Sequence, residues 1–431
     1  MKLKPIRIDR FFITIFILVS INIFGFYNFY KDGLFQIFNT FDLFIILLNL
    51  VFFAIFTVNK KFRRICLIKP LKYLFYFYVV VLIAFFSMPL RGPTSVLDAM
   101  RVGRYYLIIP LAFLIYYDVL TENKGLYYFK LFQIISIISA CQIIINAISP
   151  DFINLIFTGI GRAEAEYYNF YQRNVLLSKT MIFPHILAVY YYYKIITKKF
   201  NLNNLVMFLF LLLASSLQGF RVYLIILIFI LALITILYGK NIKNFIRWTV
   251  ISIIVLSITI ILDIQVLNNQ IYGKFYTAYY DITHDTGSYH YRLETVKIRQ
   301  IFLLLEKPFF GWGFIYYNSA YGRQLAIPAV SEESRIYGLY SVDSGYITIL
   351  MQFGFLGVLL ILYLYLKLSV FLFKEMKKNP AIFITTIGAI FFLIFSLYTH
   401  GAFFREFGIL PFTIMIGITA SANSSIKLIS K

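Results

Sequence analysis

Residues 221–238 read RVYLIILIFILALITILY, an apolar run whose one charged residue, Arg221, stands at its first position. About 20 apolar residues in a helix cross the hydrocarbon core of a bilayer. An isolated apolar segment must be helical there, because a helix satisfies its backbone hydrogen bonds internally. The run therefore predicts a membrane-spanning helix with an arginine at one end.

The rest of the chain repeats this pattern. Of its 431 residues, 61% are hydrophobic and 14% are charged, a composition far outside that of soluble domains. Apolar runs of span length lie near residues 11–29, 41–58, 71–88, 102–120, 127–148, 176–196, 203–217, 221–238, 246–263, 346–373, 381–399 and 407–420. We therefore predict an all-α fold, a polytopic transmembrane helical bundle of about 12 spans, with residues 1–431 as one integral membrane domain.

The formal net charge of +21 is spread over short loops, which argues against a nucleic-acid-binding surface. Basic residues mark the N-terminus and every second connection: Lys2, Lys4, Arg7 and Arg10; Lys60, Lys61, Arg63, Arg64 and Lys69; Lys198 and Lys199; Lys240, Lys243 and Arg247; Lys374, Lys377 and Lys378. Cytoplasmic loops retain Lys and Arg, so both termini are expected in the cytoplasm. The first run has no small-residue cleavage site, which predicts a retained helix.

Two long connections then fall on the external side, at residues 149–175 and 264–345. The larger lies between the ninth and tenth spans and contains an amphipathic stretch at 291–305, which predicts a helix at the outer interface. Pro308 ends that stretch, and Gly311-Trp312-Gly313 predicts a turn. Connections of this length are usually functional or disordered, and the aromatic content of the larger one favours an ordered segment.

Motifs of soluble enzymes are missing from the sequence, which has no Walker loop, GxSxG elbow, HExxH motif or dinucleotide fingerprint. ATP-driven transport by this chain alone is therefore not expected. Cys66 and Cys141 are the only cysteines, and His284 and His290 have no compelling metal-ligand spacing. We expect neither a metal nor a cofactor.

Arginines at the outer ends of helices are the strongest candidates for function. Arg221 follows a very short external turn, Arg292 opens the amphipathic stretch, and Arg101 and Arg104 lie at the outer end of the fourth span. Guanidinium groups that converge there would suit the oxygens of a diphosphate. The alternative is that each arginine only anchors its helix among lipid headgroups.

Other candidates lie in the same external region. Asp343 and Tyr346 stand where the large loop re-enters the membrane, and the Asp343 carboxylate could serve as a general base or only as a helix cap or ion-pair partner. His185 in the sixth span is a substrate-binding candidate or a packed core residue. The remaining candidates lie in external loops and are Arg162, Arg173, His400 and Arg405.

The arrangement resembles the O-antigen polymerase and ligase superfamily of bacterial envelope polysaccharide assembly. The likeness is carried by four stretches: Gly219 with Arg221; Arg292 with the 308–313 segment PFFGWG; the 343–346 segment DSGY through the 352–357 segment QFGFLG; and Gly161-Arg162 leading to Phe183-Pro184-His185. Together they cover about half of the chain.

The resemblance implies an inverting, metal-independent glycosyltransferase in the bacterial cytoplasmic membrane, with its site facing outward. Its partners would be an undecaprenyl-diphosphate-linked oligosaccharide, membrane lipid and a chain-length regulator. By resemblance Arg221 and Arg292 would hold the diphosphate. Ligases typically have a His-Asn pair at the re-entry, where this chain has Asp343-Ser344, so a Wzy-type polymerase is favoured. The alternatives are a ligase acting on lipid A core or protein, and a non-enzymatic flippase of lipid-linked sugars.

Overall fold

The computed structural model describes eighteen parts of the chain: residues 10–21, 40–68, 71–91, 96–122, 125–148, 163–168, 171–176, 180–197, 201–218, 221–238, 279, 283, 305–315, 327–328, 336–337, 345–375, 380–396 and 406–421. The ninth expected span, at 246–263, and most of the 264–345 loop lie outside these residues.

The described chain is mostly helical. Its helices are α1 (Arg10–Ile21), α2 (Thr40–Val58), α3 (Lys60–Cys66), α4 (Leu71–Phe86), α5 (Met88–Arg91), α6 (Val96–Gly103), the 3₁₀ helix η2 (Arg104–Ile108), α7 (Pro110–Glu122), α8 (Gly125–Ile148), α10 (Phe183–Thr197), α11 (Leu202–Leu217), α12 (Arg221–Tyr238), α19 (Gly345–Glu375), α20 (Pro380–Phe395) and α21 (Glu406–Ser421). Two antiparallel strand pairs interrupt them: β1 (Ala163–Tyr168) with β2 (Tyr171–Leu176), and β3 (Ile327–Pro328) with β4 (Ile336–Tyr337).

Helix length and apolar composition fit a helical membrane protein. Three described stretches, at Arg104–Thr121, Leu126–Ile148 and Thr348–Lys374, are long and apolar enough to cross a membrane. A fourth candidate is α2 with α3, which bend by 112° at their junction. Six further apolar helices of 10–17 residues accompany them among the described residues. Exposed side chains such as Ile225, Ile228 and Ile236 of α12 present the apolar surface that lipid requires.

Several sequence-based boundaries agree with the structure and three need correction. The helices expected at 203–217 and 221–238 are α11 and α12. Leu176, expected to open the sixth span, ends β2 instead, and α10 begins only at Phe183. The span expected at 102–120 is divided, since α6 ends at Gly103 and η2 precedes α7. Gly354 breaks the span expected at 346–373, with φ +66° and ψ −177°.

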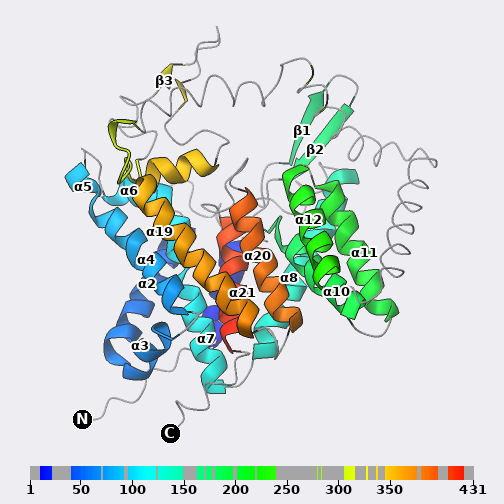
Figure 1. Ribbon diagram of the computed structural model, residues 1–431, viewed down its shortest axis with the longest axis horizontal. Coiled ribbons are helices and arrows are strands. Elements are labelled where there is room, and N and C mark those ends of the chain that lie inside the picture. The colour runs from blue at the N-terminus through cyan, green and yellow to red at the C-terminus, as the bar shows by residue number, and fades with distance from the viewer. Residues whose placement is uncertain are drawn as a thin grey trace.

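The helices are arranged around a buried centre. α7, α20 and α21 lie between α2, α3 and α4 on one side and α10, α11 and α12 on the other (Figure 1). Residues 105–119 are buried in nearly every position, as are most residues of α20. Gly417 of α21 lets this helix approach α7 closely, because a Cβ there would lie 2.9 Å from the Ile115 side chain.

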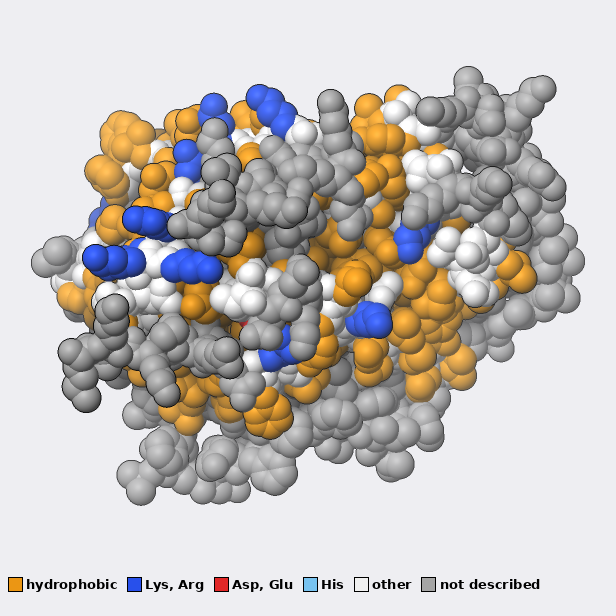
Figure 2. All heavy atoms as spheres, turned by 90° about the horizontal axis from the view of Figure 1, so that it is seen from below, with side chains coloured by type: hydrophobic (Ala, Val, Ile, Leu, Met, Phe, Trp, Pro, Cys, Tyr) orange, Lys and Arg blue, Asp and Glu red, His pale blue; other side chains and the backbone are white. Residues whose placement is uncertain are grey.

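The two ends of the bundle differ in character. α3 lies at one end, and α5, α6, β1 and β2 lie at the other (Figure 1). Lys60, Lys61 and Arg64 of α3 are exposed, and the face seen from below carries several Lys and Arg side chains (Figure 2). Residues 60–64 and the pair of strands β1 and β2 therefore lie at opposite ends of the bundle.

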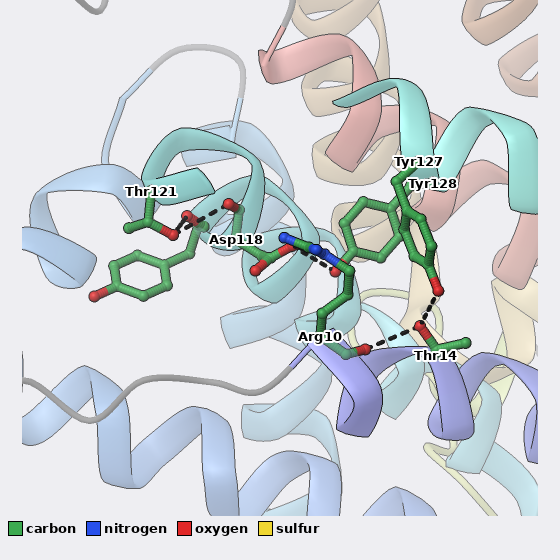
Figure 3. A network of polar contacts seen from close by, with 7 residues as sticks. Arg10, Thr14, Asp118, Thr121, Tyr127 and Tyr128 are labelled. Carbon is green, nitrogen blue, oxygen red and sulfur yellow. Dashed lines mark hydrogen bonds and ion pairs between the residues drawn. The ribbon is translucent and has the colours of Figure 1, made fainter. Parts of the chain in front are cut away.

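A polar network ties α1 to α7 and α8 (Figure 3). Arg10 Nε donates to Asp118 Oδ2 at 3.2 Å, and the Tyr128 hydroxyl donates to the same oxygen at 2.8 Å. The hydroxyls of Thr14 and Tyr127 lie 3.0 Å apart. Asp118 is only 3% exposed, so its charge is compensated by the guanidinium and the phenol, as a buried carboxylate requires.

Candidate functional site

The corner between α11 and α12 carries the arginine that the sequence analysis ranked first. α11 ends at Leu217, and the Gln218 backbone N–H donates to the Ala214 carbonyl at 3.1 Å. Arg221 is the first residue of α12. Because three residues span at most about 11 Å, the Arg221 backbone stays close to the buried Gln218 side chain.

His185 lies beside this corner. Its side chain is fully buried near the start of α10, and its ring centroid is 6.1 Å from that of Tyr223 and 5.6 Å from that of Phe392. Tyr223 follows Arg221 by two residues on α12. The structure therefore brings the imidazole next to the first turn of the helix that Arg221 begins. Packing between two aromatic rings also accounts for part of the burial of His185.

A second corner is an interlock between residues 308–312 and the break of α19, residues 351–356, which we call the glycine interlock. The Trp312 N–H donates to the Met351 carbonyl at 2.7 Å. In return, the N–H groups of Phe355 and Leu356 donate to the carbonyls of Pro308 and Phe309, at 2.8 and 3.2 Å. Donors that the break in the helix releases are thus satisfied by the loop, as buried backbone requires.

Only glycine fits at two positions of the glycine interlock. Gly311 and Gly354 both have φ +66°, which L side chains rarely adopt. A Cβ on Gly354 would lie 2.3 Å from the Phe309 carbonyl oxygen, and a Cβ on Gly311 would lie 2.5 Å from the Met351 oxygen. The turn expected at 311–313 and the break of α19 at Gly354 therefore belong to one contact.

Aromatic packing holds the glycine interlock against η2 and α4. Phe314 stacks on Phe85 with ring centroids 4.4 Å apart and meets Phe353 edge-on at 5.4 Å. The Tyr106 hydroxyl donates to Gln352 Oε1 at 3.0 Å in a fully buried bond. These contacts join four segments of the chain, α4, η2, residues 308–314 and α19, and place η2 directly beside α19.

Arg104 opens η2, two residues before Tyr106. Its Nη2 donates to the Tyr105 hydroxyl at 3.0 Å, and its guanidinium carbon lies 5.0 Å from the centre of the same ring. A second cation near the glycine interlock is Lys307, whose Nζ lies 4.2 Å from the centre of the Trp312 ring. Partly buried cations of this kind increase the positive potential of the surrounding region.

The structure describes some of the remaining candidates and not others. Tyr346 lies in the first turn of α19 and is partly buried against the core. Arg101 is placed by its backbone in α6, and Arg173 by its backbone in β2, where its Cα partner is Glu166. The candidates that lie outside the described residues are Arg292, Asp343, Arg162, His400 and Arg405. Among the described residues, no group of three His, Cys, Asp or Glu side chains could hold a metal ion.

Sequence reasoning missed Tyr106, Gln352 and Lys307. Gln352 stood inside the quoted 352–357 segment, so its position next to Gly354 was a usable signal. Tyr106 had no such signal, because the bond to Gln352 joins residues 246 positions apart.

Comparison with known proteins finds that part of the chain matches one protein family. Residues 203–362 match the family described as O-antigen ligase. The match covers α11, α12, the glycine interlock and the first half of α19, together with the positions of Arg221, Arg292 and Asp343. It confirms the resemblance to the O-antigen polymerase and ligase superfamily. No curated protein matches the chain.

Proposed function

Because residues 203–362 carry the O-antigen ligase pattern, we propose that the protein is a Wzy-type polymerase of a bacterial surface polysaccharide. It joins undecaprenyl-diphosphate-linked repeat units at the outer face of the cytoplasmic membrane. The observation that carries the proposal is that Arg221, inside the matched region, begins α12 beside the buried His185. A diphosphate carrier is the ligand that arginines at an outer helix end suit best.

The proposed topology has twelve spans and cytoplasmic ends. The 149–175 and 264–345 connections face the exterior, and the second forms the cover of the site. The exposed basic residues of α3, at the end opposite β1 and β2, support this orientation. The glycine interlock supports a fixed junction between the large loop and α19, since backbone hydrogen bonds join the two in both directions.

The proposed chemistry is an inverting transfer without a metal. The acceptor hydroxyl of one repeat unit attacks the anomeric carbon of the growing glycan, and the bond from that carbon to the diphosphate oxygen breaks. Arg221 and Arg292 stabilise the charge that develops on the departing undecaprenyl diphosphate. Asp343 accepts the hydroxyl proton as general base. The bond from the sugar to the diphosphate leaving group is already activated, so no nucleotide is needed outside the cell.

The other candidates bind substrate in this proposal. Arg104 and Arg101, at the start of η2 and in α6, contribute positive potential, and Tyr346 lines the re-entry at the start of α19. The candidates that contact the glycan are His185 of α10 and, in the external connections, Arg162, Arg173, His400 and Arg405.

Deletion of the gene followed by a glycan gel tests the proposal. Loss of a polymerase leaves single repeat units on the final acceptor. Long chains stranded on the carrier lipid identify a ligase instead, and repeat units confined to the cytoplasmic leaflet identify a flippase. Complementation with Arg221→Ala is expected to leave single repeats, whereas Arg64→Ala, on the exposed basic face, restores full chains. A normal ladder from Arg221→Ala contradicts the mechanism.

A further inference from the structure

A buried, uncharged polar cluster lies at the end of α8 that leads to the 149–175 connection. Ser139, Gln142 and Asn146 occupy one face of α8, at positions i, i+3 and i+7, and all three are at most 2% exposed. Such a polar stripe inside an apolar bundle costs free energy unless each group finds a partner.

The stripe faces α10 and α11. The Ser139 hydroxyl donates to the Thr180 carbonyl at 2.9 Å, directly before α10. Ile143 and Ala147, which follow Gln142 and Asn146 by one residue each, pack with Leu217 of α11 in a small buried cluster. Gln218 succeeds Leu217 and is 1% exposed. The amides of α8 and α11 therefore flank the same helix contact, near the start of α12.

Gln142 is the residue that points to a ligand. Its side chain is 1% exposed, and neither Nε2 nor Oε1 has a hydrogen-bond partner among the described residues. One donor and one acceptor are thus presented together, an arrangement that a hydroxyl group satisfies by donating to Oε1 and accepting from Nε2.

The cluster favours a neutral ligand. The only cationic residues of α8, α10 and α11 are Lys130 and Lys194, and both lie toward the opposite ends of their helices. Lys130 precedes Gln142 by about 18 Å along α8. Arg221, which begins α12 three residues after Gln218, would bind the diphosphate, whereas the amides of the stripe suit sugar hydroxyls, which carry no charge.

We propose that Gln142 is a glycan-binding residue, which hydrogen-bonds sugar hydroxyls of the lipid-linked substrate beside the diphosphate site. This inference rests on the proposed function and adds a subsite that recognises the sugar rather than the carrier. β2 contacts α8 and carries Arg173, so this strand lies against the helix that carries the polar stripe.

Affinity measurements on the full-length protein in lipid nanodiscs test the subsite. The two probes are undecaprenyl diphosphate and the undecaprenyl-diphosphate-linked repeat unit extracted from cells that lack the chain. Gln142→Leu is expected to lower the affinity for the glycan-bearing lipid about tenfold and to leave that for undecaprenyl diphosphate unchanged, since one or two hydrogen bonds are lost. Gln142→Met is a second apolar variant of similar length.

Gln133→Leu is the matched control, because Gln133 lies on the same helix and donates to the Tyr191 hydroxyl at 3.2 Å. It is expected to leave both affinities unchanged. Gln142→Leu should also keep or raise the Tm of the ligand-free protein, since it removes an unpartnered buried amide. A glycan preference that survives in Gln142→Leu, or an equal loss for both lipids, overturns the subsite.

The same measurements separate this inference from the proposed function. If wild type binds neither lipid, the polymerase proposal fails and the subsite fails with it. If wild type binds undecaprenyl diphosphate but does not favour the glycan-bearing lipid, only the subsite fails. Gln142→Leu could instead lower the Tm and leave the preference for the glycan-bearing lipid unchanged. That result would mean that the Gln142 amide hydrogen-bonds buried water and not the glycan, and it also overturns the subsite.

Discussion

Substitution of Gly354 by alanine tests whether the glycine interlock holds residues 308–312 on α19. The backbone of Gly354, with φ +66° and ψ −177°, lies in a region that costs a side chain about 1–3 kcal/mol. A Cβ would also lie 2.3 Å from the Phe309 oxygen, so the loop must retreat. That movement breaks the bonds from Phe355 and Leu356 to the loop, each contributing about 0.5–1.5 kcal/mol.

The expected destabilisation is therefore about 2–6 kcal/mol. Thermal unfolding of purified protein in mild detergent measures it as a lowered Tm. Gly388→Ala is the control, because Gly388 lies within α20 and a Cβ there would meet Val189 Cγ1 at 3.3 Å, a tight contact that a small shift relieves. We expect that control to change stability by less than about 1 kcal/mol. Equal Tm values for the two variants would refute the interlock.

Three further predictions concern the basic end of the bundle. Arg10→Ala leaves the buried Asp118 carboxylate with only the Tyr128 hydroxyl as a partner, and should lower the free energy of unfolding by about 2–4 kcal/mol. Thermal unfolding measures this loss, and the control Arg64→Ala, at an exposed position, should show no measurable change. The Cys66 thiol is fully buried, so in a Cys141→Ser background its maleimide labelling should stay slow from pH 7 to about 8.5, and fast labelling of folded protein would contradict this. A cysteine at Lys61 should react with an impermeant reagent only after cells are opened, and reaction in intact cells would reverse the topology.

The helical fold was predictable because apolar runs of span length leave few alternatives in lipid. α11 and α12 match their expected ranges because charged or polar residues bound both of them: Asn201 caps α11, and Arg221 opens α12. Where a boundary depended on hydrophobicity alone, the prediction was less accurate. Leu176 is apolar and precedes α10, yet it pairs with Ala163 in the strand pair.

Contacts at the candidate site depend on distant partners and were harder to predict. The sequence predicted a turn at Gly311, and Gly354 lay inside the quoted 352–357 segment. Nothing in their spacing indicates that the two glycine backbones contact each other. The Tyr106–Gln352 bond and the burial of Gln142 likewise arise only when helices from different parts of the chain pack. Local sequence encodes helix and turn, whereas the site is formed by tertiary packing.

Reconstitution of the purified protein with its substrate tests the polymerase proposal most directly. Liposomes that contain the chain as their only protein receive the undecaprenyl-diphosphate-linked repeat unit in the presence of EDTA. We predict carrier-linked glycans of two or more repeats, with one undecaprenyl diphosphate released for each bond formed. If wild-type protein binds the repeat unit yet releases no undecaprenyl diphosphate, the assignment as a polymerase is wrong.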